Sequence, residues 1–240
     1  IALAISADPS AVVAAASAAA PARSVADPDW RAEVVAATGL GRAGWPALAS
    51  AAAGPMHPLR LAAAASRHLT DQDVFVGDGG EFGQWAQAAL AFLGRSPARV
   101  LNGPSGAIGA SIPFALGARL ARPAARVVAF LGDGTAGYHL AELDTAVRHR
   151  LPFLAVVGDD ARWNAEVQIQ RGLGGAALDC LEIVGARYDR AAEALGAHAE
   201  RVDDPRALDG AIARALAAGR PALLDVAIRG EPAPTYQPGH

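Results

Sequence analysis

Two acidic loops in the chain each follow a short segment that is apolar throughout. Residues 127–131 run directly into Gly-Asp-Gly-Thr at positions 132–135, and residues 153–157 run into Gly-Asp-Asp-Ala-Arg-Trp-Asn at positions 158–164. Glycine lets a backbone turn tightly and approach a ligand closely. The N–H groups that follow such a turn suit an oxyanion such as a phosphate. The first loop is therefore a candidate phosphate-binding loop.

Asp133 stands between the two glycines of the first loop, beside any phosphate bound there. Because like charges repel, a carboxylate at this position favours an anion only if a cation lies between them. Proteins bind Mg²⁺ through one or two carboxylates together with substrate phosphates. If the two apolar segments are neighbouring parallel strands, Asp160 lies beside Asp133 as a second ligand. A lone Gly-Asp-Gly is equally consistent with a plain turn, but the two loops in succession predict a diphosphate–Mg²⁺ site.

Short apolar segments alternate with helical patterns from residue 58 onward. Candidate strands cover residues 74–76, 100–101, 127–131, 153–157, 199–202 and 222–228, and candidate helices cover residues 59–68, 84–93, 108–120, 138–148, 190–195 and 205–217. This alternation predicts an α/β fold, a doubly wound parallel sheet with helices on both faces. Ligands of such sheets bind at the carboxyl ends of the strands, where both acidic loops stand.

The first part of the chain is less regular. The pattern predicts a strand at residues 1–6 and helices at residues 9–20 and 30–37. We therefore expect a short helical and linker segment at residues 1–56 and one main domain at residues 57–240. A G-x-G-x-x-G sequence at residues 39–44 lacks the preceding strand, the following helix and the later acid of a dinucleotide fingerprint. We assign no dinucleotide site there.

The composition excludes several classes of function. The chain has 240 residues and no lysine, so it contains neither a Walker A loop nor a Schiff-base lysine. Its 21 basic and 24 acidic residues give a net charge of −3, and we expect neither nucleic acid nor a membrane as partner. The single cysteine, Cys180, cannot form an internal disulfide, which favours a cytoplasmic setting. We expect Cys180 to be a small buried side chain rather than a nucleophile.

Three segments, in order along the chain, resemble one enzyme family. They are DGGEFGQW from residue 78, GPSGAIGASIPFALGARLARP from residue 103, and GDGTAGYHLAELDTAVRHRLPFLAVVGDDARWN from residue 132. Asp133 and Asp160 are 27 positions apart, as in the thiamine diphosphate (ThDP) motif. Over roughly residues 58–232 the chain thus resembles the diphosphate-binding domain of acetolactate synthase-like proteins, benzaldehyde lyase and the 2-hydroxyacyl-CoA lyases.

The resemblance implies a role for each matching position. Asp133, Asp160 and the backbone carbonyl of Arg162 would hold Mg²⁺, and the N–H groups of Gly134 and Thr135 would bind the diphosphate. The other residues expected at the cofactor are Gly80, Glu81, Phe82, Gly106, Ala107, Ile108, Gly132, Trp163 and Asn164. Ile108 matches the bulky apolar residue over which the cofactor bends, although ordinary helix core is the alternative for it. Glu81 is equally consistent with a surface acid.

Two features depart from the family pattern. Asp159 and Asp160 stand where many relatives have paired Asn, and the extra charge would either strengthen Mg²⁺ binding or leave Asp159 pointing to solvent. The Glu that activates ThDP lies in a separate pyrimidine-binding domain, for which residues 1–56 are too few. We therefore expect no catalytic residue in this chain. A partner subunit would supply the Glu, in a hetero-oligomer such as α₂β₂.

The resemblance implies a subunit of a split ThDP enzyme that decarboxylates 2-keto acids or makes or breaks C–C bonds. The expected substrate is a 2-keto acid such as pyruvate, or an acyloin. The alternatives are a 2-hydroxyacyl-CoA lyase-like activity, a non-catalytic ThDP-binding or assembly subunit, and a generic Mg²⁺-dependent phosphate binder. The tail at residues 231–240, which contains three prolines, would either cover the site or be disordered.

Overall fold

A computed structural model describes most of the chain. The described residues are 5–19, 28–39, 42–52, 54–103, 105–175, 179–183 and 185–234. They divide into two units, Ile1–Gly44 and Trp45–His240. The first unit contains the helices α1 (Pro9–Ala19) and α2 (Pro28–Gly39), and α1 buries none of its residues. The second unit carries the sheet and the site described below.

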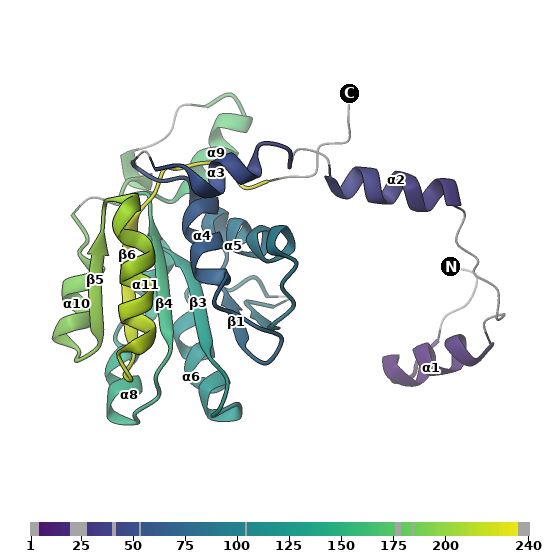
Figure 1. Ribbon diagram of the computed structural model, residues 1–240, viewed down its shortest axis with the longest axis horizontal. Coiled ribbons are helices and arrows are strands. Elements are labelled where there is room, and N and C mark those ends of the chain that lie inside the picture. Colours follow the sequence, from purple (N-terminus) through teal and green to yellow (C-terminus); the bar gives the residue numbers. More distant parts are fainter. Residues whose placement is uncertain are drawn as a thin grey trace. The chain divides into compact units, whose positions relative to one another are not determined.

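Within the described residues, six strands of the second unit form one parallel sheet (Figure 1). They are β1 (Val74–Gly77), β2 (Ala98–Leu101), β3 (Val127–Gly132), β4 (Leu154–Asp159), β5 (His198–Val202) and β6 (Ala222–Ala227). The order across the sheet is β2-β1-β3-β4-β6-β5, and every adjacent pair is parallel. The predicted α/β fold and the positions of the six strands predicted from residue 58 onward are therefore confirmed.

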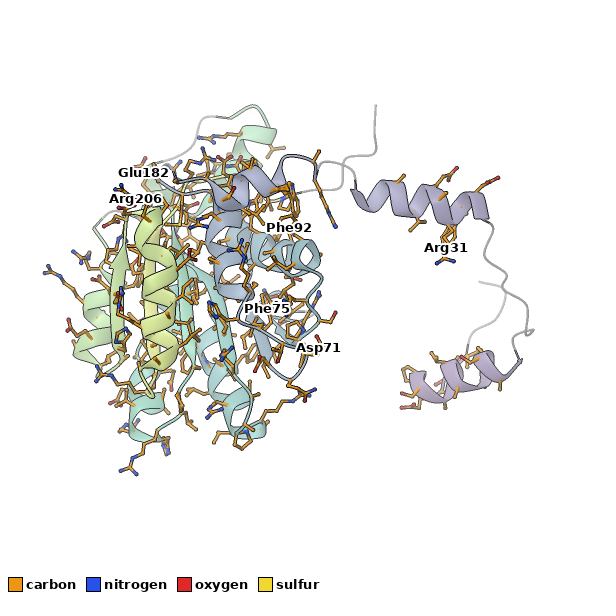
Figure 2. The ribbon with its side chains drawn as sticks, in the orientation of Figure 1. Arg31, Asp71, Phe75, Phe92, Glu182 and Arg206 are labelled. Atoms are coloured by element: carbon orange, nitrogen blue, oxygen red, sulfur yellow. The ribbon has the colours of Figure 1, made fainter. Side chains whose placement is uncertain are left out.

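Helices cover both faces of the sheet (Figure 1). One face packs against α3 (Trp45–Ser50), α4 (Pro58–Ser66), α5 (Gly80–Leu93) and α11 (Leu208–Ala217), and the other against α6 (Ser111–Ala121), α8 (Glu142–Arg148) and α10 (Tyr188–Ala194). Successive strand residues point to opposite faces, so Phe130 enters the first core and Leu131 the second. Phe75, labelled in Figure 2, is fully buried and stacks on Phe130 with ring centroids 4.9 Å apart.

The strand order creates a topological switch point between β1 and β3. From β1 the chain continues through α5 to β2 on one side, and from β3 it continues through α7 (Asp133–His139) and α8 to β4 on the other. The two connections diverge and leave a crevice at the carboxyl ends of these strands, where open α/β sheets bind their ligands. Helix α9 (Asn164–Gly172) follows β4 at the same edge.

Several helix boundaries differ from the sequence prediction. Helix α6 begins at Ser111 rather than at residue 108, because Gly106 and Gly109 adopt φ values of +63° and +86° that an α-helix does not contain. Ile108 therefore lies in the preceding loop and not in a helix core. The helix predicted at residues 138–148 is two helices, α7 and α8.

The compact unit also begins ahead of residue 57, because Trp45 packs its ring against Trp85 and Phe92 at centroid distances of 5.6 and 5.9 Å. Ile5 and Ser6 are not in a strand, and residues 1–4 of that predicted strand lie outside the described residues. Cys180 is exposed, so its predicted burial is wrong. Among the described helices, none combines the length and hydropathy required to cross a bilayer.

Candidate active site

A cavity of about 150 Å³ lies at the carboxyl ends of β1, β3 and β4. Most of the residues singled out from the sequence line it: Gly80, Glu81, Phe82, Ile108, Gly132, Asp133, Gly134, Thr135, Asp160, Arg162, Trp163 and Asn164. Gly106 and Ala107 do not line it and are exposed in the loop before Ile108. Gly79, Gly158, Ala165 and Glu166 also line the cavity, and the sequence reasoning missed them.

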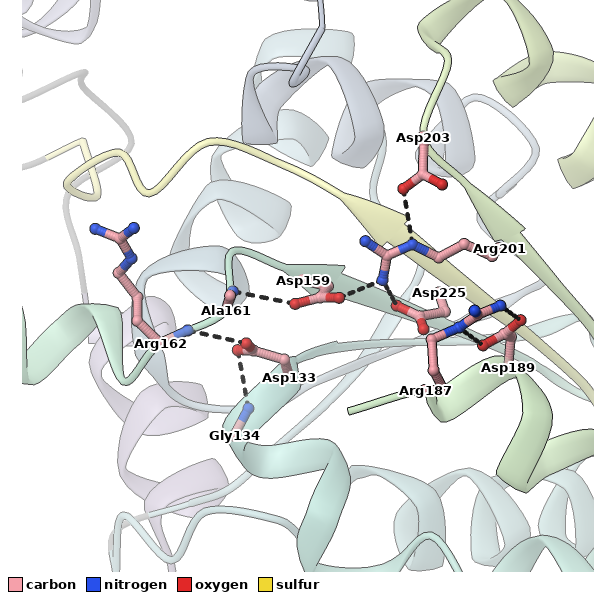
Figure 3. A network of polar contacts seen from close by, with 10 residues as sticks. All are labelled: Asp133, Gly134, Asp159, Ala161, Arg162, Arg187, Asp189, Arg201, Asp203 and Asp225. Carbon is pink, nitrogen blue, oxygen red and sulfur yellow. Dashed lines mark hydrogen bonds and ion pairs between the residues drawn. The ribbon is translucent and has the colours of Figure 1, made fainter. Parts of the chain in front are cut away.

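Asp133 joins the two acidic loops. It begins α7 and is only 2% exposed. Its Oδ1 accepts a hydrogen bond from the N–H of Gly134 at 2.9 Å, and its Oδ2 accepts one from the N–H of Arg162 at 3.0 Å (Figure 3). The second loop reaches Asp133 through Ala161, whose φ of +58° lies in the left-handed region. One buried carboxylate thus fixes the separation of the two loops.

The surroundings of the two acids disfavour their charged forms. Burial and the nearby Asp160 and Asp159 carboxylates raise the pKa of Asp133 to about 8. Burial is also the largest cause that raises the pKa of Asp160 to about 7, while Arg162 acts in the opposite direction. Both shifts express the cost of placing charged carboxylates close together away from water. A bound divalent cation would remove that cost.

The donor set fits Mg²⁺. Among the described residues, no three His, Cys, Asp or Glu side chains form a cluster able to hold a metal, so an all-protein cage is absent from that part of the chain. Two carboxylates and a carbonyl leave coordination positions for phosphate oxygens and water, which is the usual environment of Mg²⁺. The Arg162 carbonyl also accepts a hydrogen bond from the N–H of Asn164 at 3.0 Å and keeps a second lone pair.

Asp159 does not belong to this set. Its Oδ1 accepts from the N–H of Ala161 at 3.0 Å, and its Oδ2 forms an ion pair with Arg201 on β5. The same Arg201 Nη1 lies 2.8 Å from Oδ1 of Asp225, which is 0% exposed, and its Nε lies 2.8 Å from Oδ1 of Asp203 (Figure 3). The side chain of Asp159 is 11% exposed, so the alternative that it points to solvent is wrong. Arg201 neutralises the extra acid.

Two glycines permit close packing beneath the cavity. A Cβ on Gly134 would lie 2.7 Å from the Trp163 ring, and a Cβ on Gly158 would lie 2.6 Å from the Phe82 ring. The ring of Trp163 also meets Tyr138 edge-on at 6.2 Å. Because neither ring can move away without disturbing the packed wall of the cavity, positions 134 and 158 require glycine. Gly158 follows the apolar residues 153–157 as Gly132 follows residues 127–131, a parallel in the sequence that could have identified it.

The chain beyond β6 runs along the cavity rim. Glu231 accepts a hydrogen bond at its carbonyl from Asn164 Nδ2 at 3.0 Å, and Pro232 accepts one at its carbonyl from Trp85 Nε1 at 3.1 Å. The N–H of Ala233 donates to Glu81, whose pKa is raised by burial. Glu81 is therefore half-buried and binds the segment that follows β6, so it is not a surface acid. Residues 231–234 cover this edge, and residues 235–240 of the tail lie outside the described residues.

The sequence matches the family model for the "Thiamine pyrophosphate enzyme, C-terminal TPP binding domain" over residues 74–226. A probable acetolactate synthase of Mycobacterium bovis is 37% identical over 174 residues, which are 72% of this chain and 31% of that protein. A 2-hydroxyacyl-CoA lyase 2 of Xenopus laevis is 44% identical over 128 residues, 50% of this chain and 19% of that protein. The chain therefore spans a third or less of the relatives it matches.

The fold is that of a known structure. A thiamine diphosphate-dependent 4-hydroxybenzoylformate decarboxylase from Rhodococcus jostii superposes with a TM-score of 0.66 at 22% identity. The superposition covers 75% of this chain and 34% of that one. At this level of identity the likeness concerns the fold.

We expect Asp160→Asn to stabilise the chain at pH 8, and not at pH 5, when no divalent cation is present. The raised pKa of Asp160 means that the folded state favours the protonated carboxyl. Protonation of Asp160 therefore contributes to the free energy of unfolding fully below pH 4, and this contribution is lost as pH rises through about 7. Asn does not titrate. The free energy of unfolding of the variant minus that of the wild type, from urea melts in EDTA, should therefore be roughly 1–2 kcal/mol larger at pH 8 than at pH 5. The exposed Asp71→Asn is the control, and equal pH dependence in Asp160→Asn and wild type would contradict the assignment.

We expect Arg201→Leu to cost roughly 3–5 kcal/mol of unfolding free energy, because it leaves Asp159 and the fully buried Asp225 without their cation. Adding Asp159→Asn should restore part of the loss. The matched control is Arg206→Leu, whose ion pair with Asp204 is at the surface and should cost less than about 1 kcal/mol. Denaturant melts measure all three, and equal costs for Arg201→Leu and Arg206→Leu would exclude the neutralising role.

Proposed function

Because the chain belongs to the thiamine pyrophosphate enzymes, as their C-terminal TPP binding domain, we propose that its cavity is the diphosphate half of an active site that makes or breaks a bond next to a carbonyl. ThDP with Mg²⁺ is the cofactor of this family. The observation that carries the proposal is the pair of carboxylates in the cavity at the carboxyl ends of β3 and β4, the buried Asp133 and the partly buried Asp160.

The proposed roles follow the geometry. Asp133 and Asp160 would hold Mg²⁺ with the carbonyl of Arg162, and the N–H groups of Gly134 and Thr135 in the first turn of α7 would bind the diphosphate, that of Gly134 by leaving its present bond to Asp133 Oδ1. Thr135 Oγ1 is already engaged, since it donates to the carbonyl of Gly132 at 3.0 Å. The backbone, rather than the hydroxyl, is therefore the donor offered by Thr135. Asn164 supports the wall, because its amide bonds both Gln168 and the carbonyl of Glu231.

The apolar wall has a separate task. Ile108, Phe82 and Trp163 line the cavity with non-polar surface that excludes water from bound ligand. Ile108 is the residue over which we propose that the two rings of ThDP bend. When bound, ThDP supplies a carbanion that adds to carbonyl carbons and an electron sink for the bond that breaks. The chain's own residues bind and orient the cofactor.

The activating Glu of the proposed site lies outside these 240 residues. A separate pyrimidine-domain subunit in a hetero-oligomer is the arrangement that we propose from the sequence. In the Mycobacterium bovis relative, the matched stretch is only 31% of one chain, so there the remaining sequence is on the same polypeptide. Both arrangements complete the site with a domain that this sequence does not contain.

We propose a 2-keto acid such as pyruvate as the substrate, in an acetolactate synthase-like decarboxylation and carboligation, or an acyloin in the reverse sense. The second candidate is cleavage of a 2-hydroxyacyl-CoA, which is favoured by similarity to proteins named 2-hydroxyacyl-CoA lyase 2 in several animals. A non-catalytic assembly role is the third. That role gives no reason to keep Asp133 and Asp160 where burial disfavours their charged forms.

We expect no turnover from this chain alone with ThDP and Mg²⁺, and turnover once a pyrimidine-binding domain is supplied. Product analysis with pyruvate and, separately, with a 2-hydroxyacyl-CoA identifies the substrate class. Asp133→Ala should lower the rate of the completed enzyme on the order of 100-fold, because a metal ligand is lost. Robust turnover by the chain alone would contradict the half-site, and full activity in Asp133→Ala would favour the assembly role.

A further inference from the structure

Asp78 is a buried acid that no proposed role yet uses. It follows β1 directly and is 3% exposed. No basic side chain in the described part of the chain forms an ion pair with it. Its carboxylate instead accepts hydrogen bonds from three backbone N–H groups. These are Gly79 at 2.8 Å, Gly109 at 3.0 Å to Oδ1 and 3.2 Å to Oδ2, and Ser111 at 3.3 Å.

These bonds make Asp78 the cap of a helix on another element. Helix α6 begins at Ser111, and its N-cap residue, Ala110, has no side chain that could accept a hydrogen bond. A carboxylate at a helix N-terminus is stabilised by the orphan N–H groups and by the helix dipole. Asp78 thereby ties the carboxyl end of β1 to the loop that leads into α6.

Ile108 stands immediately before the residues that Asp78 holds. Its Cγ2 is so close to Gly79 that a Cβ on that glycine would lie 2.9 Å away. On the other side of the loop, His139 Nδ1 lies 2.8 Å from the carbonyl oxygen of Gly109 and must donate, since a carbonyl only accepts. Gly109 is thus held at its N–H by Asp78 and at its C=O by His139, in a conformation (φ +86°) that favours glycine.

We propose that Asp78 is a positioning residue that holds Ile108 in the cavity wall and so determines how well the rings of ThDP fit. This inference rests on the proposed function. According to this inference, the site has two parts that different residues hold in place. The acidic loops after β3 and β4 bind Mg²⁺ and the diphosphate, and the Asp78-held loop shapes the space for the thiazolium and aminopyrimidine rings.

The separation can be measured without turnover, because inorganic diphosphate carries the phosphates of ThDP but not its rings. With Mg²⁺, we expect Asp78→Asn to weaken ThDP binding to the chain about tenfold, or 1.4 kcal/mol, and to leave diphosphate binding within about twofold. Asn cannot accept at both positions of the carboxylate, and its NH₂ group would face backbone donors. Ile108→Ala should have the same selective effect. The double variant should bind ThDP no more weakly than the worse single one, since the two act as one unit.

Asp73 provides a matched control at the opposite end of the same strand. It is also buried, and its carboxylate accepts from the Thr70 N–H, the Thr70 hydroxyl and the Arg126 N–H at 2.8 Å each. Asp73→Asn should cost comparable stability and change the affinity for neither ligand.

Several results would overturn the inference. Unchanged ThDP affinity in Asp78→Asn would do so, as would equal losses for ThDP and diphosphate or the same ThDP loss in Asp73→Asn, because these indicate a merely structural role. Additive losses in the double variant would show that Asp78 does not act through Ile108. A wild-type chain that binds neither ligand with Mg²⁺ would instead overturn the proposed function itself, and the inference with it.

Discussion

The site depends on two carboxylates, Asp133 and Asp160, that a parallel sheet brings together with little access to water. β3 and β4 are neighbours and end at the same level, so Asp133 and Asp160 must share one edge of the sheet. Without a cation the folded chain compensates by raising the pKa of both groups. A divalent cation with an anionic ligand resolves the repulsion and restores charge balance. Ligand binding and the stability of this edge are thereby linked.

The rest of the edge limits what the acids can bind. Arg201 pairs with Asp159, and of the two adjacent acids only Asp160 lines the cavity. Glycines at 134 and 158 let aromatic rings pack directly under the loops. On the β1 side, Asp78 fixes the loop that carries Ile108. Polar and apolar walls therefore meet at the switch point, each held by its own buried carboxylate.

The sequence predicted those features that depend on local pattern. Residues 127–131 and 153–157 are apolar throughout because helices cover both faces of their strands, and the loops that follow them meet as expected. Features set by long-range contacts were missed. The partner of Asp159 is Arg201, on a strand that is not its neighbour in the sheet. Asp78, which lies on another element, binds the N–H of Ser111 at the start of α6. The helical pattern of the sequence does not contain this contact, so it predicted a helix that began too early and included Ile108.

The most direct test of the central claim is calorimetric titration of ThDP into the chain with and without Mg²⁺, beside the same titration of Asp133→Ala. If the paired carboxylates bind the diphosphate through a cation, binding by the wild-type chain should require Mg²⁺ and should be lost in the variant. Binding that is equally tight without Mg²⁺, or that persists in Asp133→Ala, would show that the acids do not hold the cofactor and would contradict the account.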